Sequence, residues 1–110
     1  MRELVKSKRF SAELDRALRG GLPLDDWQHL SYLLAKYEAL PVEYAEHRVT
    51  DNWEGLWDCH LEGDLVVLYR RTAKKVVLVR IGTHEEVFLH RKRQRRKRGL
   101  WGWFTGVEVG

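Results

Sequence analysis

Histidines and carboxylates gather in the second half of the chain at spacings that suit proton transfer. Asp58 and His60 are two residues apart in an alternating segment, so their side chains share one side of a strand, about 6–7 Å apart. Asp64 closes a Glu-Gly-Asp turn, His84 follows a Val-rich segment, and His47 precedes them all. We therefore expect one end of a sheet to collect His47, His60, Asp64 and His84.

A pair of imidazoles near neutral pH can accept one proton and deliver another. Cleavage of RNA by its own 2′-hydroxyl requires a base that removes the hydroxyl proton, an acid that protonates the departing 5′-oxygen, and positive charge near the phosphorus. Asp58 or Asp64 would orient an imidazole or hold it protonated, and Phe88, near His84, would stack on a base. Such chemistry needs no metal and no cofactor, and we expect neither.

A zinc site is the alternative interpretation of the same residues. Cys59 and His60 are adjacent on a strand, so their side chains diverge, and the chain has no C-x-x-C or H-x-x-x-H pair of ligands. Cys59 is the only cysteine, which excludes an internal disulfide. We interpret Cys59 as a small core residue on the face opposite His60.

Apolar periodicity predicts two helices before the sheet. The first has one apolar face, made of Phe10, Leu14, Ala17 and Leu18, and ends at Gly20-Gly21. The second is expected to start with Asp25 as its cap, with Gln28 completing a capping box, and to stop at Pro41. Its predicted buried stripe comprises Trp27, Leu30, Leu33, Leu34 and Tyr37.

Three later segments have the composition and alternation of strands: Trp57–Leu61, Leu65–Arg71 and Val76–Ile81. Their short connections require antiparallel pairing, because a parallel crossover needs a dozen or more residues. Arg2–Lys6 is a candidate first strand. The predicted fold is therefore α+β, with two N-terminal helices packed on a small antiparallel sheet of three or four strands.

Charge divides the chain into a domain, residues 1–90, and a tail, residues 91–110. The domain holds 13 Lys/Arg and 15 Asp/Glu, whereas the tail holds 7 Lys/Arg and one Glu. Arg91–Arg98 has the composition of a solvated arm or of a segment that contacts ribosomal RNA, and both interpretations stay open. With no apolar run of about 18 residues and no secretory signal, we expect a cytoplasmic protein that does not enter a membrane.

Several longer motifs resemble one family. They are Leu40-Pro41-x-x-Tyr44-x-x-His47, Trp53-x-Gly55, Asp58-x-His60-x-x-x-Asp64, Leu68-Tyr69-Arg70 and Arg80-x-Gly82-Thr83-His84-x-x-x-Phe88. Over residues 2–89 the chain closely resembles the YafQ family, bacterial type II toxin–antitoxin toxins of the RelE/ParE superfamily. The histidine spacings match without a gap.

The resemblance implies a microbial-ribonuclease-like α+β fold and ribosome-dependent cleavage of mRNA in the decoding A site. It also implies neutralisation by a cognate antitoxin of the DinJ/RelB type. Carried over by position, the catalytic residues are His47, His60, Asp64 and His84, with His84 favoured as the base. The supporting substrate contacts are Phe88, Asp58 and Arg80.

Three positions depart from the family pattern. Asp51 stands where a glycine is usual, Trp57 where an arginine commonly precedes Asp58, and Leu65 where a tryptophan commonly follows Asp64. These differences would remove a phosphate contact and a base-stacking ring, and so reduce activity or change codon preference.

Two functions of other kinds remain as alternatives. In the first alternative, the chain is a non-catalytic toxin of the same fold that acts by protein binding, like the ParE-type gyrase inhibitors. Such toxins, however, have no need of a histidine cluster. In the second alternative, the chain is a nucleic-acid-binding module that works through its basic tail.

Overall fold

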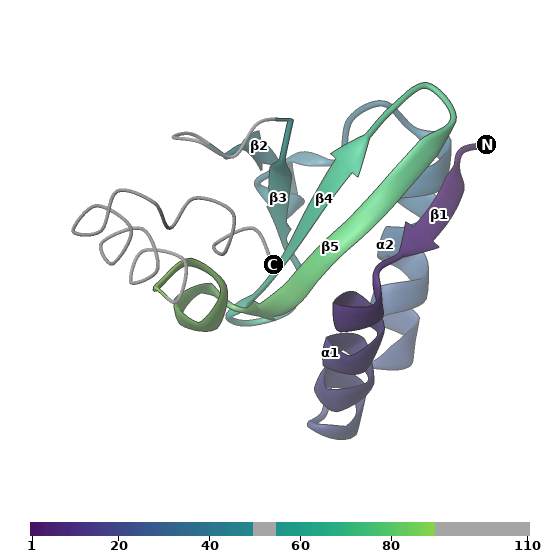
Figure 1. Cartoon of the computed structure of the whole chain (residues 1–110). Coiled ribbons are helices and arrows are strands. Elements are labelled where there is room, and N and C mark those ends of the chain that lie inside the picture. The colour runs from purple at the N-terminus through teal and green to yellow at the C-terminus, as the bar shows by residue number, and fades with distance from the viewer. Residues whose placement is uncertain (50–54, 90–110) are drawn as a thin grey trace, which may run out of the picture.

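A computed structural model of the chain describes residues 1–49 and 55–89 (Figure 1). The elements are, in order, β1 (Glu3–Lys6), α1 (Lys8–Arg19), α2 (Leu24–Lys36), the 3₁₀ turn η1 (Val42–Tyr44), β2 (His47–Arg48), β3 (Trp57–His60), β4 (Leu65–Arg71), β5 (Lys75–Thr83) and the short π-helix η2 (Glu85–Leu89). The α+β fold class predicted from the sequence is confirmed. Asp51, Trp53 and the tail, residues 91–110, lie outside the described residues, so the expectations about them stay predictions.

One sheet, in the order β1-β5-β4-β3-β2, separates two faces. Both long helices cover one face, where the main core joins Phe10 and Leu30 to Val67, Tyr69 and other buried residues (Figure 1). A smaller cluster of Leu56, Val66, Leu68 and Val87 lies on the opposite face, beside η2. Period-two alternation thus directs the apolar positions of the central strands into two cores.

The sheet is mixed, which corrects the expectation of purely antiparallel pairing. The strands from β2 to β5 are antiparallel, as their short connections require, but β1 runs parallel to β5, with Glu3 beside Lys75 and Lys6 beside Leu78. The argument from connection length applies only to consecutive strands. The two strands β1 and β5 are separated by nearly the whole domain, so that argument does not restrict their direction.

The second helix also corrects the prediction at both ends. It begins at Leu24 with Pro23 as its N-cap, and Asp25 lies in the first turn with Asp26, where a carboxylate interacts favourably with the helix dipole. It ends at Lys36 rather than near Pro41; Tyr37 is extended, and the Arg2 N–H donates to the Ala35 oxygen of the last turn at 2.8 Å. Tyr37 is therefore outside the helix and 45% exposed, not part of the buried stripe.

The edge of β5 beyond the end of β1 is covered by side chains rather than by a strand. The Ser7 hydroxyl donates to the Val79 carbonyl at 3.2 Å. The Ile81 N–H donates to Glu13 at 3.1 Å, and the Thr83 N–H donates to Glu86 at 2.9 Å. Ser7 also caps α1 by accepting from the Phe10 N–H at 2.9 Å, so one hydroxyl ties the helix start to the sheet.

Over residues 1–49 and 55–89, no helix has the length and apolar character that crossing a membrane requires.

Phe10 should dominate the packing of helix against sheet. It is fully buried, and its ring centroid lies 5.5 Å from that of Trp27. We expect Phe10→Ala to lower the free energy of unfolding by about 3–5 kcal/mol, through lost burial and the cavity left behind. Urea denaturation measures this loss. Leu24→Ala, at an exposed apolar position, is the control and should change stability by less than about 0.5 kcal/mol.

Candidate acid–base site on the open sheet face

Asp58 is the buried centre of the site. It lies on β3, is only 3% exposed, and is the one buried charged residue in the described part of the chain. His47 on β2 is its cross-strand partner, and His47 Nδ1 lies 3.2 Å from Asp58 Oδ1. The same nitrogen donates to the Ala45 carbonyl oxygen at 3.0 Å, so the Asp58 contact is an ion-pair distance and Asp58 Oδ1 has no hydrogen-bond partner among the described residues.

His60 shares the Asp58 side of β3, as the alternation predicted. Cys59, between them, is fully buried in the main core on the helix side. Burial raises the pKa of the Cys59 thiol far above its usual value, so no thiolate is available to a metal at neutral pH. Among the described residues, no group of three or more His, Cys, Asp and Glu side chains is arranged to hold a metal ion.

A tight reversal brings Asp64 and His84 together. Gly63 adopts φ +59°, a left-handed conformation that favours glycine, and the chain turns from β3 into β4. The His84 N–H then donates to the Asp64 carbonyl at 3.2 Å, which joins the end of β5 to this turn. Both side chains are exposed on the resulting rim.

A capping box sets the direction of the chain at His84. The Thr83 N–H donates to the Glu86 carboxylate at 2.9 Å, and the Glu86 N–H donates to the Thr83 hydroxyl at 3.1 Å. Phe88 follows one turn later, with its ring centroid 4.7 Å from that of His84. The half-buried Phe88 ring also packs on the smaller core, so it supports His84 from the side. Neither this box nor η2 was predicted from the sequence, although Thr83-x-x-Glu86 is the pattern that would have indicated them.

All three histidines act electrostatically on Asp58. Burial is the largest influence and raises the pKa of the Asp58 carboxyl, while the charges of His47, His60 and His84 oppose that rise. The arrangement places one buried carboxylate within electrostatic reach of three imidazoles, the side chains most used in general acid–base chemistry.

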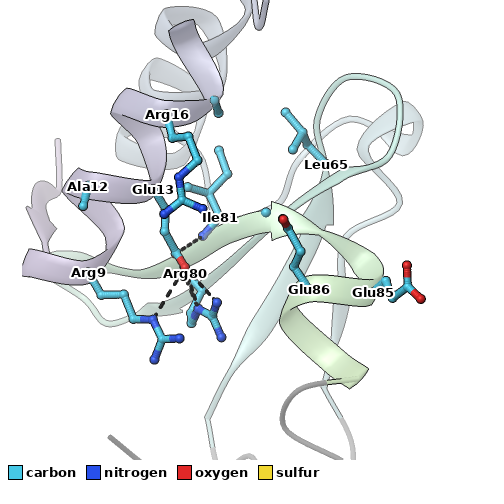
Figure 2. Close-up of a pocket in the computed structure, with 11 residues that line it drawn as sticks. Arg9, Ala12, Glu13, Arg16, Leu65, Arg80, Ile81, Glu85 and Glu86 are labelled. Carbon is cyan, nitrogen blue, oxygen red and sulfur yellow. Dashed lines mark hydrogen bonds and ion pairs between the residues drawn. The ribbon is translucent and has the colours of Figure 1, made fainter. Parts of the chain in front are cut away.

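The Arg80 guanidinium is held by α1. Its Nη2 lies 2.7 Å from Glu13 of α1, and its Nε also donates to that carboxylate (Figure 2). Arg9 joins the same carboxylate at 3.5 Å, and these residues line an open cleft between α1 and η2 (Figure 2). In the sheet, Arg80 pairs with Leu68, which is also the partner of Asp58, so the role of Arg80 as a substrate contact stays a prediction.

Arg70 is the cation that sequence reasoning left without a role. Tyr69 points into the main core, so alternation along β4 puts Arg70 on the Asp58 side, two residues from the Asp58 partner Leu68. It is exposed, and the ion pairs found among the described residues do not include it. The alternating pattern of Leu65–Arg71 was the signal that could have assigned it.

Two departures from the family pattern lie away from the histidines. Trp57 packs against the main core and lies under the Arg48 guanidinium, 5.6 Å from the ring centroid. Leu65 also packs against that core and lines the cleft beside α1. Neither side chain therefore changes the open face on which Asp58 and His60 lie.

The fold and the site together define a class of protein. It is a small α+β domain whose helices cover one sheet face and whose other face presents imidazoles around a buried carboxylate for proton transfer. Residues 2–89 match the family model of YafQ, the bacterial toxin of type II toxin–antitoxin systems. The chain belongs to the YafQ family of toxins.

Relatives of known structure share the whole domain. The mRNA interferase toxin YafQ of Escherichia coli BL21-DE3 is 30% identical over 88 residues, which are 79% of this chain and 96% of that protein. YafQ in the E. coli DinJ–YafQ complex superimposes with a TM-score of 0.73 at 29% identity, covering 80% of this chain and 99% of that one. A metal-bound toxin from Helicobacter pylori superimposes with a TM-score of 0.73 at 28% identity, covering 80% of this chain and 100% of that one.

Asp58→Asn should make the domain more stable at neutral pH. The raised pKa means that the fold disfavours the ionised carboxylate, so stability falls as pH rises from the unfolded-state pKa through the folded-state pKa. Asparagine removes that penalty, and its advantage should disappear below about pH 4, where the unfolded carboxyl is protonated too. Urea denaturation of both proteins from pH 3 to 8 measures the difference in their free energies of unfolding. Asp15→Asn, at an exposed site, is the control, and a loss of stability at pH 7 in Asp58→Asn would contradict the expectation.

Proposed function

We propose that this protein is an endoribonuclease that cleaves mRNA in the decoding site of the ribosome and acts in the cytoplasm. The supporting observation is the set of three histidines that surround the buried Asp58 on the open sheet face. Two E. coli relatives, each matched over 96% of its length, are named mRNA interferase toxins, which supports the same substrate class. The partner mRNA would lie across the face that the helices leave uncovered.

The proposed reaction uses the RNA 2′-hydroxyl as its nucleophile. One imidazole takes the hydroxyl proton while O2′ bonds to phosphorus, and a second gives a proton to O5′ as the P–O5′ bond breaks. His84 is assigned as the base, because the capping box and the Phe88 ring fix its position. His47 or His60 supplies the acid, and we assign Asp58, whose Oδ1 lies 3.2 Å from His47 Nδ1, to orient it. Asp64 completes the set at the rim, and no step in this scheme requires a metal or a cofactor.

Cations outside the histidine set would hold the RNA backbone. We assign Arg70 to a phosphate near the scissile one, because it is exposed on the Asp58 side of β4. The domain carries more acidic than basic residues, so we assign the 7 Lys/Arg of residues 91–110 to ribosomal RNA. A cognate antitoxin of the DinJ/RelB type is proposed as the neutralising partner, since the E. coli relative was solved with DinJ.

Removal of either central histidine should abolish cleavage without unfolding the domain. We expect His84→Ala and His60→Ala each to lower the cleavage rate by about 10²–10⁴-fold, the usual contribution of a general acid or base. Primer extension on an mRNA in a translating extract, with and without ribosomes, measures discrete cuts. His29→Ala, at an exposed position on α2, is the matched control and should cut normally.

The same assay separates the competing functions. Cuts that persist in both variants would contradict the assignment of the site, and cuts without ribosomes would contradict ribosome dependence. Metal independence is tested by treating the wild type with EDTA and adding magnesium back to keep the ribosomes intact. A loss of cutting that zinc or copper then restores would contradict a metal-independent mechanism. DNA-damage signalling without mRNA loss would favour the gyrase-inhibitor alternative.

Arg70→Ala should weaken substrate binding more than chemistry. A charge-assisted contact contributes about 1.5–3 kcal/mol, so we expect KM to rise by roughly 10–100-fold with a smaller change in kcat. Arg19→Ala, an exposed arginine on the helix side, is the control. Equal effects of the two substitutions would show that only overall charge matters.

A further inference from the structure

His47 is delivered by a segment with little regular structure of its own. Between α2 and β2 the described chain forms only the single turn η1, followed by Ala45 in the left-handed region at φ +49°. His47 itself is exposed on the outermost strand, β2, which has two residues. Something other than secondary structure must therefore fix the His47 ring beside Asp58.

Glu46, one residue earlier, is held by three residues from two separate parts of the fold. Arg71 Nη2 lies 2.9 Å from Glu46 Oε2, and the Tyr69 hydroxyl donates a short hydrogen bond to the same oxygen. Oε1 accepts from the Leu40 N–H at 2.8 Å. Both carboxylate oxygens are thus engaged, by β4 on one side and by the segment before η1 on the other.

This cluster is buried and consists of groups that depend on one another. The Glu46 and Arg71 side chains are 8% and 10% exposed, and Tyr69 is fully buried. The Arg71 guanidinium also stacks on the Tyr69 ring, 5.6 Å from its centroid. Neither Arg71 Nε nor Nη2 has a hydrogen-bond partner among the described residues, so Nη2 contacts Glu46 as an ion pair. Burial, first of all, raises the pKa of the Tyr69 phenol, so that it remains a hydrogen-bond donor at neutral pH. A buried ion pair of this kind contributes more to fixing one arrangement than to net stability.

We propose that Glu46 is a positioning residue that fixes His47 for its role in the site. Successive side chains of an extended chain point to opposite sides, and Glu46 is anchored toward Tyr69, on the helix side of the sheet. His47 is thereby directed to the Asp58 side, with Nδ1 between the Ala45 carbonyl at 3.0 Å and Asp58 Oδ1 at 3.2 Å. The inference rests on the proposed function only for the part that His47 takes in cleavage.

A purely structural role for Glu46 is the competing explanation, and a double-mutant cycle distinguishes the two. If Glu46 acts through His47, Glu46→Gln should lower kcat by up to about 100-fold with little change in KM, as expected for a misplaced catalytic group. In a His47→Ala background the same substitution should then cause no further loss. Losses that multiply in the double variant would overturn the proposal.

The position of the His47 ring can be followed without any activity. In NMR spectra of the full chain, Glu46→Gln and Tyr69→Phe should shift or broaden the His47 ring signals, assigned by their absence in His47→Ala. Tyr69→Phe keeps the buried ring and removes only the hydroxyl, so it serves if Glu46→Gln folds poorly. Glu43→Ala, on the exposed side of η1, is the control and should leave the His47 signals unchanged.

The outcomes separate this inference from the proposed function. Unchanged His47 signals in both Glu46→Gln and Tyr69→Phe would overturn the positioning role, whatever the activity. Displaced signals together with full cleavage by His47→Ala would retain the positioning role and remove His47 from the catalytic set.

Discussion

The register of β3 against β4 is the constraint on which the rest of the molecule depends. In the observed register Cys59 faces Val67 within the main core, while Asp58 and His60 lie opposite Leu68 and Val66 on the other face. A slip of one residue would exchange the two faces, burying a carboxylate and an imidazole under the helices. Fold and site are therefore specified by the same alternation, because the residues that make the core require the polar residues between them to face outward.

That alternation is also why so much was predictable from the sequence. The bounds of β4 and the opposite facing of Cys59 and His60 follow from local composition and period. The end of α2 and the exposure of Tyr37 did not follow, because the Ala35 carbonyl in the last turn of that helix accepts from Arg2, a contact between distant parts of the sequence. The parallel pairing of β1 likewise joins residues more than seventy positions apart, which no local pattern encodes.

Within the site, the residues named by motif and the residues placed by the fold differ in an informative way. His47, His60 and His84 come near Asp58 because strand pairing and a turn bring them there. The Arg80 guanidinium pairs with Glu13, which belongs to a helix whose docking cannot be read from the strand. Glu46 was equally hidden, because its partners Leu40, Tyr69 and Arg71 are assembled only by tertiary packing. Long-range contacts of buried ions are what single-sequence reasoning leaves out.

The parallel pairing of β1 with β5 has a consequence for how the protein is made. The first strand to be synthesised finds its neighbour only when Val76, Val77 and Leu78 have been added, and Glu13 binds Ile81 later still. Such contacts of high sequence separation require closure of a very long loop before they stabilise anything. The nascent chain consequently stays without its native sheet during most of translation. A product that ends before β5, even one that contains His47 and His60, lacks the strand that joins β1 to β4 and so cannot complete the native sheet.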